Sequence, residues 1–316
     1  MILIATLVLQ LTAAPGNALD PRLGLFRAAG GERLIVFPRD SGQLGIGYGA
    51  GEVRGLAGVG HFRQATSGQS SGSSVDVPFE DLAKDVLAAV AVLTRDPAIR
   101  PGAIGLFGTS QGIWVALQAT TLSRDLAFLV LVSGGGTSPL DAELNRGRQT
   151  LERATQLTAA QIAAATAFRR RKFEFAITGE RKDEYDRILA AARSEPWFKH
   201  IGDGLPNQAF WRPNGLFDPI PPLQAFRKPV LAMFGALDTN NDAARNAELM
   251  EAAWKVAGNP RGKAVVFERA NHGLFETDHR IPLERELPSL TRFVPRYIDL
   301  LTRWLEEVAP GSSGGQ

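Results

Sequence analysis

The pentapeptide GTSQG at residues 108–112 constrains the fold of this chain most, because it joins two kinds of apolar pattern. A short apolar run at 103–107 precedes it, and an apolar helical pattern begins at Ile113. A strand that passes into a helix over so few residues must turn sharply, and glycines on both sides of the serine remove Cβ atoms that would collide. The pattern predicts a strand–turn–helix that leaves the Ser110 hydroxyl exposed at the carboxyl end of the strand.

Further apolar runs have the length and continuity of strands that are buried on both faces. They lie at residues 126–132, 229–234 and 263–267. Helical patterns are found at residues 79–95, 242–254 and 295–308, the last beginning at Pro295. Strands alternating with helices predict an α/β fold, with a mostly parallel sheet, helices on both faces and a ligand site beyond the carboxyl ends of the strands.

Two polar residues follow the later predicted strands, an acid at Asp238 and an imidazole at His272. A serine hydroxyl, an imidazole that takes its proton and a carboxylate that orients the imidazole are the groups used in covalent acyl transfer. Asp242, four residues after Asp238, is the reserve acid. Each residue also has a simpler interpretation: Ser110 as a turn serine, Asp238 as a helix N-cap, and His272 as a loop-packing histidine.

With these motifs the sequence resembles the α/β-hydrolases, and within them esterase-like and peptidase-like serine hydrolases with a helical insertion before the acid-bearing strand. The resemblance runs from about Phe79 to the end of the chain. It is carried by FEDLAKD at 79–85, GTSQG at 108–112, DP at 218–219, GALD at 235–238 and ANHG at 270–273.

The resemblance implies the order of a Ser-Asp-His triad, with Ser110 as nucleophile, Asp238 as orienting acid and His272 as base. The backbone N–H of Gln111 is then expected to be one oxyanion donor. A second donor is not identified, because no Gly-rich loop of the usual kind precedes residue 108. Backbone amides near residues 60–61 or 66–67 are the candidates for this second donor. The side chain of His61 is interpreted as that of a loop or strand histidine without a catalytic role.

The function implied is cleavage of a carboxylic ester through an acyl-enzyme, without metal or cofactor. A peptidase that acts on small peptides is the nearest alternative, since the same triad chemistry serves both bonds. The missing oxyanion loop motivates a second alternative, in which the chain is a hydrolase-like binding protein that has lost turnover.

The chain divides into five predicted segments. Residues 1–18 are a signal peptide or contain a first core strand. A signal peptide predicts export, and a core strand predicts a cytoplasmic location. Residues 19–136 and 224–308 form the two parts of the core, 137–223 a helical cap, and 309–316 a flexible tail.

Within the predicted cap, Thr158 is expected to cap a helix at its N-terminus. Trp197, Phe210 and Trp211 are expected either to line a substrate pocket or to pack the cap onto the core. The basic run at 169–172 is interpreted as a solvated helix face.

Composition narrows the possible partners. Thirty-five basic against 33 acidic residues give a net charge of +2, which offers no electrostatic case for nucleic acid. The chain has no cysteine and only four histidines without paired spacing, so no metal site is expected. The N-terminal apolar run is shorter than the ~20 residues of a membrane-spanning helix, so no stable membrane insertion is expected. Oligomeric state is left open.

Overall fold

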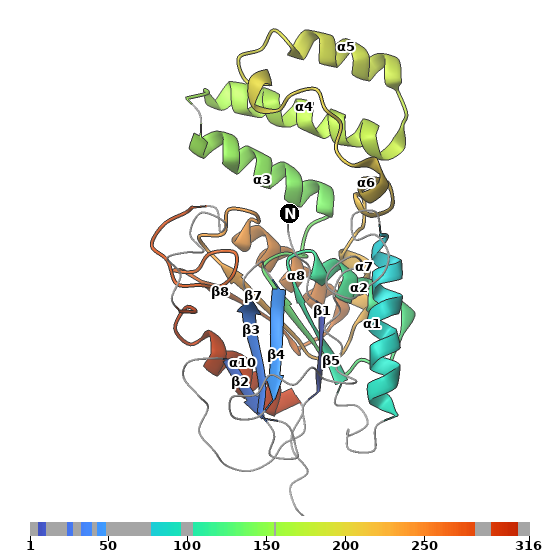
Figure 1. The fold of residues 1–316 in the computed structure, drawn as a ribbon, viewed down its shortest axis with the longest axis vertical. Coiled ribbons are helices and arrows are strands. Elements are labelled where there is room, and N and C mark those ends of the chain that lie inside the picture. Colours follow the sequence, from blue (N-terminus) through green and yellow to red (C-terminus); the bar gives the residue numbers. More distant parts are fainter. Residues whose placement is uncertain are drawn as a thin grey trace, which may run out of the picture.

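The structure, a computed structural model, describes residues 77–95, 104–154, 156–281 and 292–308. Within residues 1–50 it describes four strands by their backbone. Its main sheet has five strands in the order β1-β5-β6-β7-β8 (Figure 1). Their bounds are Thr6–Gln10, Ile104–Thr109, Leu129–Val132, Val230–Gly235 and Gly262–Phe267. A second, antiparallel sheet contains β2 (Gly24–Arg27), β3 (Arg33–Arg39) and β4 (Gln43–Tyr48).

The last four strands of the main sheet are parallel, so their carboxyl ends meet at one edge. Thr109 is in register with Val132, Val132 with Met233, and Met233 with Val265. Strands β6 and β7 are buried along their whole length, as expected for apolar strands covered on both faces. The predicted α/β class and parallel arrangement are confirmed.

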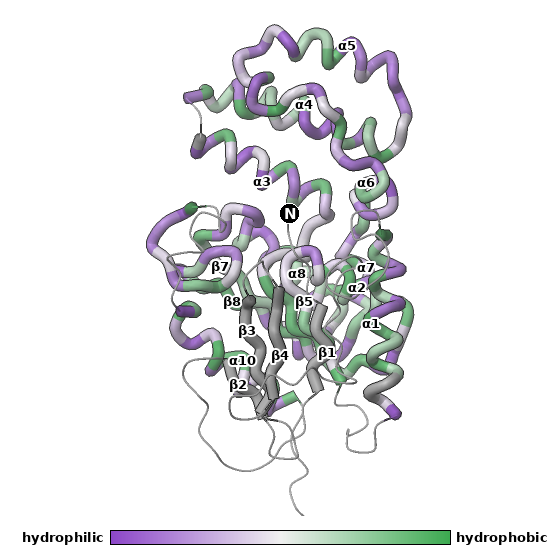
Figure 2. The backbone as a smooth tube through the Cα atoms, viewed as in Figure 1, coloured by the Kyte–Doolittle hydropathy of each residue, from purple (hydrophilic) through white to green (hydrophobic). Residues whose placement is uncertain are grey.

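Helices of the body cover this sheet. They are α1 (Phe79–Thr94), α2 (Gly112–Leu122), α7 (Ile220–Ala225), α8 (Ala243–Ala257) and α10 (Tyr297–Val308). Trp304 of α10 lies edge-on against Phe128, with ring centroids 5.9 Å apart, and both side chains are buried. Figure 2 shows hydrophobic residues concentrated in the strands and helices of the body.

A group of helices separates β6 from β7 in the chain and stands above the body in Figure 1. Its members are α3 (Pro139–Ala154), α4 (Ala159–Thr178), α5 (Lys182–Ala192), the short 3-10 helix Phe198–His200 and α6 (Gln208–Asn214). We call these helices the cap. Thr158 caps α4 in a reciprocal capping box with Gln161, as its sequence position predicts.

The basic run in α4 differs from its interpretation as a solvated face. Arg170 and Arg171 are exposed, but Lys172 is only 5% exposed and Arg169 pairs with Glu143 at 2.7 Å. The Lys172 ammonium donates to the Gly202 carbonyl at 2.9 Å, and burial lowers its pKa. Half of this run therefore holds the cap together.

The closing helix starts two residues later than its sequence pattern predicts. Arg296 has a φ of 70°, in the left-handed region, so a right-handed helix cannot continue from Pro295 through it. The helix begins at Tyr297 instead. Leu301 and Trp304 of this helix are buried in the core.

The N-terminal run contains strand β1, which pairs antiparallel with β5. This is the arrangement of the first-core-strand interpretation, while cleavage of residues 1–18 stays a prediction. His61, the candidate oxyanion segments around it and the tail at 309–316 lie outside the described residues. Across the described part of the chain, no helix combines the length and apolar character needed to span a membrane.

Candidate active site

Ser110 stands at the turn between β5 and α2, and its backbone is strained. Its φ is 51°, in the left-handed region that residues other than glycine seldom adopt. Its N–H donates to the Val132 carbonyl at 2.9 Å, which holds the turn against the next strand. A Cβ on Gly108 would lie 2.6 Å from the Gly112 carbonyl oxygen, so the turn requires glycine there. These are the features of the sharp turn that the pentapeptide predicts.

The backbone N–H of Gln111 follows the serine and is available to a ligand. Among the described residues it has no hydrogen-bond partner. It lies at the start of α2, where the positive end of the helix dipole favours a negative charge. This position suits an oxyanion donor, as predicted from the sequence. The segments considered for a second donor, near residues 60–61 and 66–67, lie outside the described residues.

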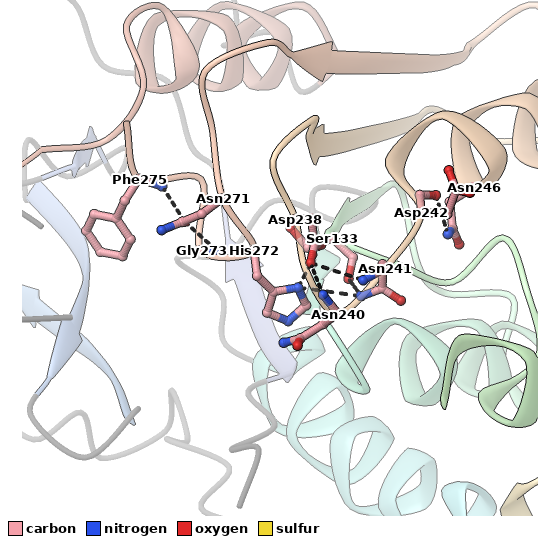
Figure 3. Close-up of polar contacts among 10 residues, drawn as sticks. All are labelled: Ser133, Asp238, Asn240, Asn241, Asp242, Asn246, Asn271, His272, Gly273 and Phe275. Carbon is pink, nitrogen blue, oxygen red and sulfur yellow. Dashed lines mark hydrogen bonds and ion pairs between the residues drawn. The ribbon is translucent and has the colours of Figure 1, made fainter. Parts of the chain in front are cut away.

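Asp238 and His272 form a buried pair at the carboxyl edge of the sheet (Figure 3). Asp238 Oδ2 lies 2.8 Å from His272 Nδ1, and the two residues are 2% and 9% exposed. Asp238 Oδ1 accepts from the backbone N–H groups of Asn240 at 2.7 Å and Asn241 at 3.0 Å. The carboxylate is thus fully hydrogen-bonded on the side away from the imidazole, which fixes its orientation.

The two aspartates after β7 have different positions. Asp242 is the N-cap of α8, where its exposed side chain accepts from the Arg245 N–H at 3.0 Å. Asp238, and not Asp242, contacts His272. The helix-cap interpretation therefore applies to the reserve acid.

Asn241 is a site residue that the sequence interpretation missed. Its side-chain Nδ2 donates to the Ser133 carbonyl at 3.0 Å and lies 3.5 Å from His272 Nδ1. Ser133 directly follows β6, the strand beside the serine turn, and also has a left-handed backbone, with a φ of 65°. Asn241 therefore links the acid loop after β7 to the loop after β6.

The loop that carries His272 is shaped by its neighbour. Asn271 Oδ1 accepts from the N–H groups of Gly273 at 2.9 Å and Phe275 at 3.2 Å. A Cβ on Gly235 would lie 2.3 Å from the Ala270 carbonyl oxygen, so only glycine lets the end of β7 approach this loop. The sequence GALD at 235–238 provides that glycine beside the acid.

The structure brings the acid and the histidine together, and it places the serine turn at the same edge of the sheet. Hydrogen bonds between a nucleophile and its base often tighten only when substrate binds.

The three aromatic residues predicted as pocket lining have packing partners in and beside the cap. Trp197 is 3% exposed and lies against Phe168, with ring centroids 5.4 Å apart. It therefore packs inside the cap. Trp211 contacts Phe173 edge-on at 4.6 Å, and Phe210 contacts Phe79 of the body at 6.1 Å. A substrate-binding role for Trp197, Phe210 and Trp211 stays a prediction.

A cavity of about 570 Å³ lies between the first turn of α3, α7 and the first turn of α8. Asp242 lines it, whereas Ser110, Asp238 and His272 do not. The described residues contain no group of three or more His, Cys, Asp and Glu side chains that could hold a metal ion.

No protein-family model matches the chain, and no curated protein matches it in sequence. Among solved structures, an esterase of Pyrococcus furiosus is 11% identical over 95% of this chain and 98% of that chain, with a TM-score of 0.44. A thermophilic esterase from Thermogutta terrifontis is 20% identical, over 78% and 79% of the two chains, with a TM-score of 0.41. The monoacylglycerol lipase of Paleococcus ferrophilus is 16% identical, over 78% and 82%, with a TM-score of 0.41.

The chain's own geometry defines its class: a parallel sheet with a serine turn after β5, an acid after β7 and a histidine after β8. This is the arrangement of the α/β-hydrolase fold, as the motifs predict.

Proposed function

We propose that this protein is a serine hydrolase that cleaves carboxylic esters through an acyl-enzyme on Ser110. The observation that carries the proposal is the buried Asp238–His272 pair, at the sheet edge where the strained serine turn also ends. Burial of a carboxylate and an imidazole in a protein interior costs free energy, because both groups lose their contact with water. A function explains why such a pair is present: the carboxylate orients the imidazole as a general base.

The pair prepares His272 for proton transfer. Asp238 can only accept a hydrogen bond when ionised, so the contact at 2.8 Å places the imidazole proton on Nδ1. Nε2 is then left with a lone pair to take the Ser110 proton as the oxygen attacks the ester carbonyl. The negative charge of Asp238 stabilises the imidazolium that forms, and His272 returns the proton to the leaving alcohol.

Charge on the tetrahedral intermediate falls on the carbonyl oxygen, which needs hydrogen-bond donors. The N–H of Gln111 supplies one, and its position at the start of α2 adds the field of the helix. Loss of one such donor typically costs about 100- to 1,000-fold in rate. Water then attacks the acyl-enzyme with His272 again as base, which completes hydrolysis.

Labelling with a fluorophosphonate tests the proposal, because this probe reacts with activated serines. We expect the wild type to be labelled and Ser110→Ala to be unlabelled, with ester turnover lowered at least ~1,000-fold. Ser133→Ala is the matched control: Ser133 directly follows the neighbouring strand β6 and also has a left-handed backbone, yet it lies outside the GTSQG turn. This variant should keep both labelling and turnover.

A folded wild type that stays unlabelled would overturn the proposal and favour a binding protein that has lost turnover. If labelling succeeds, p-nitrophenyl esters compared with aminoacyl anilides choose between ester and peptide cleavage. Faster cleavage of the anilides would replace the esterase proposal by the peptidase alternative.

A further inference from the structure

Two arginine side chains from different parts of the molecule converge on one neutral oxygen. Gln149 of α3 is only 4% exposed, and its Oε1 accepts from Arg153 at 3.3 Å and from Arg280 at 3.5 Å. Arg153 lies in the last turn of α3 in the cap, whereas Arg280 follows the histidine loop of the body. The two guanidinium groups therefore meet where cap and body join.

Carboxylates close to these arginines in the chain are already paired with other residues. Glu152 pairs with Arg148, and Asp278 pairs with Arg269. Among the described residues, neither Arg153 nor Arg280 forms an ion pair within 4.0 Å. The two positive charges consequently lie near each other, and neither has an ion-pair partner in the described part of the chain.

This arrangement is electrostatically unfavourable for the protein alone. Burial, and then the positive charge of Arg280, lower the pKa of Arg153, and the negative charge of Glu152 opposes this shift in part. Both residues are nevertheless exposed enough for their guanidinium groups to reach a ligand. An anion placed between the two groups would remove their repulsion.

The position of Arg280 connects this pair to the candidate active site. Its Nη2 donates to the Ala236 carbonyl at 2.6 Å. Ala236 directly follows β7 and stands two residues before Asp238. The guanidinium group of Arg280 is thus held against the acid loop, at the sheet edge from which the site residues project.

Separate structural roles explain each arginine but not their convergence. Arg153 near the carboxyl end of α3 interacts favourably with the helix dipole, and Arg280 anchors its loop to Ala236. Neither role requires the two guanidinium groups to share the Gln149 oxygen. Each guanidinium group carries five N–H donors, more than its bonds to Gln149 and Ala236 use, and a carboxylate accepts charge-assisted bonds from such donors on both of its oxygens.

We propose that Arg153 and Arg280 bind a carboxylate carried by the substrate, so that the enzyme prefers esters with an acidic group beyond the scissile bond. The proposal deepens the esterase function and depends on it for the identity of the ligand as substrate. Binding of a carboxylate at this place can still be tested without any turnover.

Calorimetric titration of glutarate into the full chain tests the binding. We expect the wild type to bind glutarate and the double variant Arg153→Gln/Arg280→Gln to bind it at least ~10-fold more weakly, because each charge-assisted hydrogen bond is worth about that factor. Arg148→Gln is the matched control, since this arginine lies on the same helix but is paired with Glu152. It should bind like the wild type. Absence of glutarate binding to the wild type overturns the site, whether or not the protein hydrolyses esters.

Kinetics with an acidic and a neutral ester of similar length then test recognition of the substrate. For p-nitrophenyl hemiglutarate we expect KM to rise at least ~10-fold in Arg153→Gln and in Arg280→Gln, while p-nitrophenyl valerate is unaffected. Equal changes for both esters, or no change for either, overturn the substrate role. Arg280→Lys keeps a donor for Ala236 but loses the fork, so it should remain folded and still discriminate poorly. Wild-type discrimination in this variant also contradicts the proposal.

Discussion

The sheet edge and the cap bury polar groups in different ways. At the sheet edge, Asp238, Asn241 and His272 are buried and hydrogen-bonded to one another or to backbone, and Ser133 Oγ beside them has no partner in the described residues. The cap contains more such atoms: Asn145 Nδ2, Arg169 Nε, Tyr185 OH and Trp197 Nε1. A fully bonded buried network fixes one geometry, whereas unpaired groups leave a structure less uniquely determined.

The apolar cores differ in the same direction. The body has one continuous core that includes the strands β5, β6 and β7. The cap has two small clusters, one around Phe168 and Trp197 and one around Phe173 and Ile177. Regions with fewer buried apolar contacts open at lower free energy. We infer that the body holds the chemical groups rigidly and that the cap is the part that can adapt.

The largest test of this contrast is Asp238→Asn, which keeps the shape of the side chain but removes its charge. We expect kcat/KM for a p-nitrophenyl ester to fall by about 10⁴-fold, because an amide favours the wrong histidine tautomer. Asp242→Asn serves as the matched control and should keep its activity, since Asp242 only caps α8. Equal losses in the two variants would contradict the assignment of the acid.

Removal of a cap residue should affect stability and leave the chemistry unchanged. For Trp197→Ala we expect the free energy of unfolding to fall by about 3–5 kcal/mol, as for other buried aromatic residues. Turnover of a short ester at a temperature where the variant is folded should stay the same. Leu205→Ala, at a cap residue that is 41% exposed, should change stability by less than about 0.5 kcal/mol.

The outcome that contradicts this expectation is a change in chain-length preference. If Trp197→Ala shifts the preferred acyl length of p-nitrophenyl esters, then Trp197 lines a substrate pocket. The contrast between a chemical sheet edge and a packed cap would then be too simple.

The smallest of these effects concerns Asn241, which supports the acid loop without a role in bond making. We expect Asn241→Ala to lower kcat by about 10- to 100-fold, typical for loss of a hydrogen bond behind a functional group. The pH profile of kcat should shift as well, because Asn241 lies beside His272 Nδ1. Asn240→Ala keeps its backbone bond to Asp238 and should behave like the wild type. Unchanged kcat and pH profile in Asn241→Ala would show that the link is only structural.

Sequence reasoning located the sheet and the paired acid and histidine because both follow from local patterns. Short apolar runs predicted β5 to β8, and residues just after parallel strands must meet at one edge. It did not find Asn241, because the carbonyl that Asn241 binds belongs to Ser133, 108 residues earlier. Nothing around position 241 marks that partner.

The cap was less predictable for a related reason. Trp197 contacts Phe168, and Lys172 donates to the Gly202 carbonyl. In each pair, helix α5 separates the two partners in the chain. An aromatic or basic residue in an amphipathic helix has the same local pattern whether it packs inside or faces a ligand. Tertiary packing alone decides between these outcomes.

The place where the cap enters the sheet has a consequence for how such a protein can change over evolutionary time. β6 and β7 are hydrogen-bonded neighbours, although the chain leaves the sheet at Val132 and returns at Val230. The entropy of closing a loop grows only with the logarithm of its length, so replacing a connection of about ten residues by this one adds only about 2 kcal/mol. Helices between these strands can therefore be gained, lost or exchanged while the strand pairing, and with it the acid–histidine pair, is preserved.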